Sequence, residues 1–278
     1  MVKQPTEIKL LKQSNNYQLL IYSIIAALGG LLFGFDTGVI SGAIPFIRNE
    51  FELTAYQEGF AVSNLMIACT IGALIAGPIA DWAGRKKVLI LCSLLFLISA
   101  IFSALPQTFM ELVIARFVGG LGVGVASVVS PMYITEISPA KIRGWLVALN
   151  QLAIVVGILF SYLSNWLLLD TGINNWRFML AAESLPSLCF LFGLIFIPES
   201  PRWLMKTGDE SGALRILNIV SDKNNALNEL ADIKESLLQK KSSIKELLNP
   251  SLRKVLIVGS LFSLFAHLTG IDAVISKK

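Results

Sequence analysis

The sequence of 278 residues is too apolar for an ordinary soluble domain, since 54% of its residues are hydrophobic, 15% are charged and the mean hydropathy is +0.68. Its net charge of +4 comes from lysines and arginines spread over short segments rather than one basic stripe, which disfavours nucleic-acid binding. The sequence contains no glycine-rich phosphate loop, nucleophile constellation or metal-ligand cluster. A soluble enzyme is therefore disfavoured, and neither a cofactor nor a metal is expected.

Six long apolar segments predict an all-α membrane protein, because each is long enough, or nearly so, to cross about 30 Å of hydrocarbon as a helix. They lie near residues 19–44, 57–80, 88–106, 112–134, 144–168 and 177–197, and a seventh begins near Val255. The first segment is too long for a cleavable signal peptide and is expected to stay in the mature chain. The expected organisation is a cytoplasmic N-terminus (1–18), a six-span bundle (19–200), a cytoplasmic helical region (201–252) and a truncated seventh span (253–278).

Lysine and arginine gather in alternate connections between these segments, which predicts the orientation in the plasma membrane. The N-terminus and the segments after the second, fourth and sixth spans are the basic ones, through Lys3, Lys9, Lys12, Arg85, Lys86, Lys87, Lys141, Arg143, Arg202 and Lys206. We therefore expect a multi-pass protein whose N-terminus is cytoplasmic.

The polar region after the sixth span carries apolar residues at spacings typical of amphipathic helices. A solvated linker is the alternative. The residues that favour packed helices are Leu214, Leu217, Ile219, Val220, Leu227, Leu230 and Ile233.

Two charged residues lie inside apolar segments, Asp36 in the first and Arg116 in the fourth. A charge at bilayer depth costs about 2.5–3.5 kcal/mol even on the lenient translocon scale, so it usually faces a partner, a cavity or a substrate path. The first span also carries a ridge of Gly30, Gly34, Gly38 and Gly42, which lets another helix approach closely.

Helical periodicity places Asp36 on the face opposite this ridge, together with Phe33. An arginine side chain is long enough to join Arg116 to Asp36 across their difference in depth. The alternative is that Arg116 extends to the outer membrane interface instead.

Several strings together resemble the sugar porter family of the major facilitator superfamily. These strings are GGLLFGFDTGVISGA at 29–43, GPIADWAGRKK at 77–87, RFVGGLGVGVASVVSPMYITEISPAKIRG at 116–144, NQLAIVVGILFSY at 150–162, PESPRWL at 198–204 and LTGIDAV at 268–274. The resemblance implies a major facilitator fold, in which two six-helix bundles rock around a midplane site and each bundle contains two inverted three-helix repeats. Spans one to three and four to six are then the repeats of an N-terminal bundle.

The resemblance also implies roles for single residues. Asp36 matches the aspartate that takes the coupling proton in symporting members, and Arg116 matches the arginine paired with it. Gln151 matches a glutamine that hydrogen-bonds sugar hydroxyls, and Phe33 is a second candidate sugar contact on the face of Asp36. A hydrogen bond between helices remains the alternative for Gln151.

Charged residues at the inner ends of spans two, four and six resemble the ion-pair latches that close the inner side of the family's transporters. They are Asp81, Arg85, Glu136, Arg143, Glu199 and Arg202. Without the resemblance, they would be interpreted as a basic collar with incidental carboxylates.

The sequence departs from the family pattern near its C-terminal end. It stops at Lys278, partway through the seventh span, and has Ala266, His267 and Asp272 where the family has a glutamine pair and an asparagine. The expected function is symport of a pentose or hexose with a proton, in a protein truncated to its N-terminal half. A separate complementary C-terminal half is a possible partner, and the alternative is an inactive remnant or a membrane sensor or scaffold that binds a partner through its cytoplasmic helices.

Overall fold

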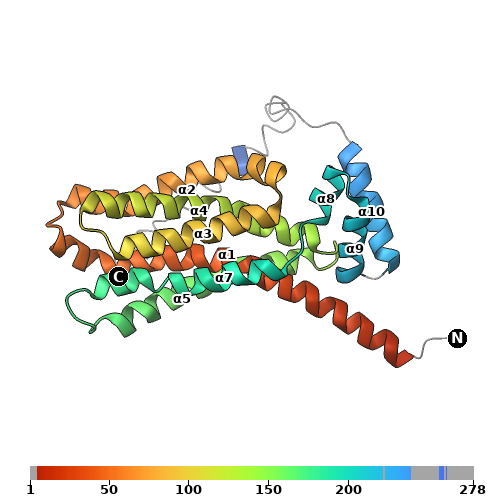
Figure 1. The fold of residues 1–278 in the computed structure, drawn as a ribbon, viewed down its shortest axis with the longest axis horizontal. Coiled ribbons are helices and arrows are strands. Elements are labelled where there is room, and N and C mark those ends of the chain that lie inside the picture. The colour runs from red at the N-terminus through yellow and green to blue at the C-terminus, as the bar shows by residue number, and fades with distance from the viewer. Residues whose placement is uncertain (1–4, 222, 239–256, 260, 262–278) are drawn as a thin grey trace.

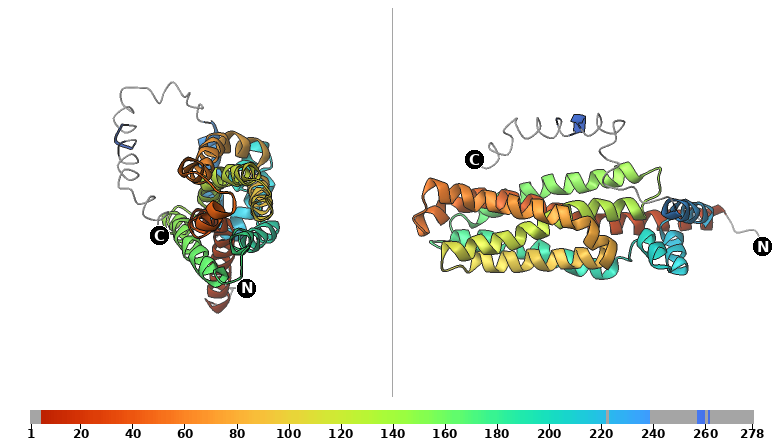
Figure 2. Two further views of the ribbon diagram at one scale, coloured as in Figure 1. Left: turned by 90° about the vertical axis from the view of Figure 1, so that its left-hand side faces the viewer. Right: turned by 90° about the horizontal axis from the view of Figure 1, so that it is seen from above.

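The computed structural model describes residues 5–221, 223–238, 257–259 and 261. Of the predicted seventh span, only 257–259 and 261 are therefore described, and His267 lies outside the described residues. Six helical segments of this part are long and apolar enough to cross a membrane, as predicted. They run side by side in one bundle (Figures 1 and 2). The helices are α1 (Pro5–Glu50), α2 (Ala55–Ala83), α3 (Arg85–Ala104), α4 (Phe109–Ile137), α5 (Arg143–Leu168), α6 (Asn175–Ala181) and α7 (Ser184–Phe196), with α6 and α7 together forming the sixth span.

The first helix begins at Pro5, well before the apolar segment that predicts it. Proline is favoured in the first turn of a helix, and no further proline or glycine follows until Gly29, so nothing interrupts the helix before the membrane. The N-terminal part of α1 extends past the end of the bundle at which α8–α10 lie (Figure 1). We call this end the inner end and the opposite end the outer end.

The sixth span is interrupted between α6 and α7, at Ala182 and Glu183. Pro186 explains the break, because proline has no N–H to donate to the carbonyl four residues earlier and its ring crowds that carbonyl. The carbonyl of Ala182 instead accepts from the N–H of Leu185, at 3.2 Å. A buried glutamate thus stands at a break in a membrane-spanning helix.

Glycines allow two pairs of helices to approach at backbone distance. On α1, a Cβ added at Gly34 would lie 1.9 Å from the carbonyl oxygen of Ile154 on α5. On α4, a Cβ added at Gly124 would lie 2.0 Å from the carbonyl oxygen of Cys69 on α2. The predicted ridge on α1 therefore packs against α5, and Asp36 on the opposite face is turned toward α4.

We expect Gly34→Ala to destabilise the bundle by about 1–3 kcal/mol or more, because the added methyl group overlaps a backbone carbonyl that no rotamer change can move. Gly77→Ala on α2 is the matched control, since an added Cβ there meets nothing within 4 Å. The measurement is the thermal unfolding midpoint of the purified protein in detergent. Equal midpoints for the two variants would contradict the tight α1–α5 contact.

Three shorter helices cap the inner end, as the amphipathic pattern predicts. They are α8 (Pro201–Thr207), α9 (Glu210–Val220) and α10 (Lys223–Leu238). Leu217 and Leu230 join them in a small core of their own, and Val220 packs on the main core of the bundle. The prediction that Leu227 packs inward is wrong: this side chain is 56% exposed, because it lies on the outer face of α10.

Candidate functional site

Asp36 and Arg116 form an ion pair in the centre of the bundle. Arg116 Nη1 donates to Asp36 Oδ1 at 2.8 Å, and each side chain is only 2% exposed. The glycine ridge of α1 sets this geometry, because its packing on α5 directs Asp36 toward α4. Arg116 therefore does not extend to the outer interface, and the alternative offered by its depth is wrong.

The pair leaves part of its hydrogen-bonding capacity unused. Asp36 Oδ2 and Arg116 Nε are buried and have no hydrogen-bond partner among the described residues. A buried ion pair repays its desolvation only when the remaining polar atoms are also satisfied, so this pair is a weak source of stability. Its arrangement suits a group that exchanges a proton better than one that only holds helices together.

Glu183 is a third charged residue at this site, and it is absent from the sequence-based set. It is buried at the break between α6 and α7, and it interacts electrostatically with both Asp36 and Arg116. Its Oε1 has no hydrogen-bond partner within the described part of the chain. The signal that identified Asp36 was available here too, because Glu183 lies in the apolar segment predicted at 177–197.

Gln151 and Phe33, the predicted sugar contacts, are not partners in the ion pair of Asp36 and Arg116. Gln151 is exposed on α5, whereas its neighbour Asn150 is buried against Gly30 of α1. Asn150, not Gln151, therefore faces another helix. Phe33 is partly buried and packs on the main hydrophobic core.

Four of the six predicted latch residues lie together at the inner end. Arg85 Nε lies 2.8 Å from Glu136 Oε2, and Arg85 Nη2 lies 3.1 Å from Asp81 Oδ1. Glu199 Oε1 accepts from the backbone N–H of Arg85 at 2.9 Å. This cluster joins the ends of α2, α3 and α4 to the segment that leads into α8.

Arg143 and Arg202 are not part of that cluster, and neither forms an ion pair within the described residues. Both line a neighbouring cavity of about 300 Å³ between the inner end of the bundle and α10, together with Glu229 and Asp232. Burial raises the pKa of Glu229, while the charge of Arg143 opposes this shift. The latch prediction thus describes two groups of residues rather than one.

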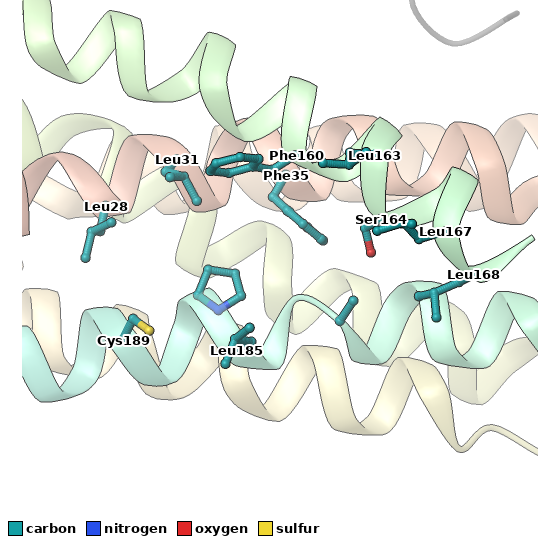
Figure 3. Close-up of a pocket in the computed structure, with 12 residues that line it drawn as sticks. Leu28, Leu31, Phe35, Phe160, Leu163, Ser164, Leu167, Leu168, Leu185 and Cys189 are labelled. Atoms are coloured by element: carbon teal, nitrogen blue, oxygen red, sulfur yellow. The ribbon is translucent and has the colours of Figure 1, made fainter.

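A groove of about 530 Å³ lies between α1, α5 and the sixth span, and Phe35 and Leu185 are among its lining side chains (Figure 3). Its surface is almost entirely apolar. A sugar site needs convergent hydrogen-bonding groups to replace the water lost from hydroxyls. This groove therefore fits lipid or an apolar ligand rather than a monosaccharide.

Comparisons with known proteins agree with these features. The model of the family described as "Sugar (and other) transporter" matches residues 22–276. The arabinose-proton symporter of Bacillus subtilis (strain 168) is 42% identical over 263 residues, which are 92% of this chain and 57% of that protein. The galactose-proton symporter of Escherichia coli (strain K12) is 38% identical over 94% of this chain and 56% of that protein.

Solved structures give the same result for the fold. The partially occluded, inward open xylose transporter XylE from E. coli superposes with a TM-score of 0.83 at 34% identity, over 93% of this chain and 65% of that one. The same symporter bound to 6-bromo-6-deoxy-D-glucose, a member of the major facilitator superfamily, gives a TM-score of 0.81. The chain spans about half the length of the curated relatives that it matches. With its six-helix bundle and the family match over nearly its whole length, this chain belongs to the sugar transporter family of the major facilitator superfamily.

Proposed function

We propose that this chain is the N-terminal bundle of a transporter that couples the movement of a monosaccharide to that of a proton. The observation that carries the proposal is the buried pair of Asp36 and Arg116, with Glu183 beside it. Ionisable residues inside a membrane are costly, and proton relays are one of the few functions that use them. The names of the relatives, which include arabinose-proton and galactose-proton symporters, support both the sugar and the proton.

The charges of this cluster suggest how a proton acts. Asp36 pairs with the guanidinium of Arg116 and Glu183 interacts electrostatically with both, so the three groups are electrically neutral when the two carboxyls together carry one proton. A proton on Asp36 weakens its ion pair with Arg116 and leaves the arginine to Glu183. Because the three groups belong to α1, α4 and the break before α7, this exchange changes the forces between three helices.

The sugar would bind on the exposed surface that carries Gln151. An amide side chain both donates and accepts hydrogen bonds, which suits the hydroxyls of a pentose or a hexose. Phe33 would contribute an apolar surface against the sugar ring. In a major facilitator fold the second bundle closes this surface from the other side.

We expect Gln151→Ala to weaken sugar binding by about 1.5 kcal/mol, or roughly tenfold, the range for losing one hydrogen bond. Leu152→Ala is the matched control, because Leu152 is the next exposed residue of α5 and offers a sugar no hydrogen bond. The measurement is the dissociation constant of a labelled sugar for the protein in detergent. An unchanged constant in Gln151→Ala would remove this residue from the binding site.

The cluster of Arg85, Asp81, Glu136 and Glu199 would act as the inner latch. The excess of lysine and arginine at this end supports a cytoplasmic location for it, for the N-terminus and for α8–α10, in a plasma membrane. Arg143 and Arg202, which form no ion pair in the described structure, would be available to carboxylates of a second bundle.

The test is uptake of labelled xylose, arabinose, galactose and glucose into vesicles that contain the 278-residue chain, with and without a proton gradient. Gradient-dependent uptake above that of empty vesicles would show that copies of this chain assemble into a working carrier. Sugar binding without uptake would restrict the chain to one half of a carrier, whereas neither binding nor uptake would contradict the proposal and favour a sensor or scaffold.

A further inference from the structure

Hydroxyl groups on the outer half of α3 differ from most of those elsewhere in the bundle. Buried serines such as Ser23 and Ser93 donate to a backbone carbonyl three or four residues earlier, at 2.9 Å and 2.7 Å. Ser99 and Ser103 of α3 form no hydrogen bond with any described residue, although both are buried. Their hydroxyls are therefore free to bond water or each other through water, which buried polar groups require.

Ser99 packs against Gly119 of α4, beside Asp36. A Cβ added at Gly119 of α4 would lie 2.4 Å from Ser99 Oγ and 3.9 Å from Asp36 Oδ2. The two oxygens thus lie beside the same bare stretch of α4 backbone and at most about 6.3 Å apart, a range in which water can connect two polar groups. Asp36 Oδ2 is also the carboxylate oxygen that Arg116 leaves unpartnered.

Ser103 lies one helical turn farther toward the outer end, on the same face of α3 as Ser99. The next residue, Ala104, ends α3, and its carbonyl accepts from Arg177 Nη1 at 3.2 Å at the start of α6. Beyond Ser99 in the inner direction, the same face carries Phe96, Cys92 and Leu89, which are buried and apolar. On this face of α3, hydroxyls therefore lie only toward the outer end.

We infer that Ser103 and Ser99, with bridging water, form the route by which protons reach Asp36 from the outer side. Each transfer along the route breaks one O–H bond and forms another, and each serine is unchanged after the proton has passed. The last transfer leaves the proton on Asp36 Oδ2. This inference rests on the proposed function, because it presumes that Asp36 takes up a proton.

Other ionisable groups also face Asp36 and belong in the test. Arg116 on α4, Glu183 before α7 and Cys69 on α2 interact with it electrostatically. Any of them can change how strongly Asp36 holds a proton. The route, in contrast, determines how fast the proton arrives, so rate and equilibrium have to be measured separately.

The experiment is a rapid pH drop on the purified chain in lipid nanodiscs, followed by the infrared carbonyl band of protonated carboxyls. The band that is lost in Asp36→Asn belongs to Asp36. The band that is lost in Glu183→Gln belongs to Glu183, so the two carboxyls can be followed separately. We expect Ser99→Ala and Ser103→Ala to slow the Asp36 band about tenfold or more without moving its pH midpoint. Ser93→Ala is the control, because Ser93 lies on the same helix but donates to a backbone carbonyl, and it should leave the rate unchanged. Ser103→Thr keeps a hydroxyl and should therefore show the rate of the unchanged protein, not the slower rate of Ser103→Ala.

The outcomes separate the route from the proposed function. If no band is lost in Asp36→Asn, Asp36 takes up no proton and the proposed function itself fails. If the Asp36 band is present but its rate is the same in Ser99→Ala and Ser103→Ala as in the unchanged protein, the route alone is wrong. A slower rate of the Asp36 band together with an equivalent shift of its pH midpoint would also overturn the route, because the serines would then change the proton affinity of Asp36.

Discussion

Asp36→Asn should reduce gradient-driven sugar uptake to the level measured without a proton gradient. Asparagine has the shape of aspartate and can accept the hydrogen bond of Arg116, but it cannot take up a proton. Because Arg116 keeps this hydrogen bond and the electrostatic interaction with Glu183, the variant should fold and bind sugar. The measurement compares sugar uptake and sugar-driven alkalinisation in vesicles with equal amounts of each protein.

Asp170→Asn is the control for this variant, because it removes a carboxylate from an exposed position near the end of α5. It should transport as the unchanged protein does. Exchange of sugar across the membrane without a gradient should survive in Asp36→Asn, since exchange needs no net proton movement. Proton movement that continues in Asp36→Asn at its original rate would place the coupling site elsewhere, with Glu183 as the next residue to test.

Arg116→Met should be the most destabilising single substitution in this cluster. It leaves the buried carboxyl of Asp36 without its cation, and removing one partner of a buried ion pair costs about 3–5 kcal/mol. Asp36→Asn should cost less, because asparagine can still accept the hydrogen bond of Arg116. The measurement is the free energy of unfolding in detergent, from denaturant titration of each purified variant.

The double variant Asp36→Leu with Arg116→Met provides the internal comparison. Replacing both members of a buried pair by apolar residues is often neutral, or stabilises by about 1–4 kcal/mol. We therefore expect it to be more stable than Arg116→Met alone while being unable to couple sugar to protons. If the costs of Asp36→Leu and Arg116→Met instead simply add in the double variant, the interaction energy between the two side chains is zero and the contact at 2.8 Å contributes nothing to stability.

Sequence reasoning identified Asp36 and Arg116 because a charge inside an apolar segment has few explanations, and the glycine ridge placed the aspartate on the correct face. Glu183 gave the same signal and was overlooked. Its electrostatic interaction with the pair could not be derived from spacing, because it depends on how the sixth span packs on α1 and α3. The break that Pro186 causes adds a local change of direction that helical periodicity does not describe.

The inner end shows a second limit of the sequence. Six charged residues share an end of the bundle by topology, but their partners depend on side-chain direction and on neighbours from distant segments. Arg85 meets Glu136 across 51 residues, whereas Arg143 is directed toward the cavity beside α10. A family pattern that names all six residues does not say which pairs form in a given state.

The separation of Asp36 and Arg116 along the chain has a consequence for biogenesis. The two residues are 80 positions apart, so α1 is made well before the arginine that neutralises its aspartate. At about 5–20 residues per second, the ribosome needs roughly 4–16 s to complete that interval. During this time α1 contains an unpaired carboxyl group, and α4 enters the membrane more easily once it meets that group. The first helix should therefore remain beside the insertion machinery until the fourth helix arrives.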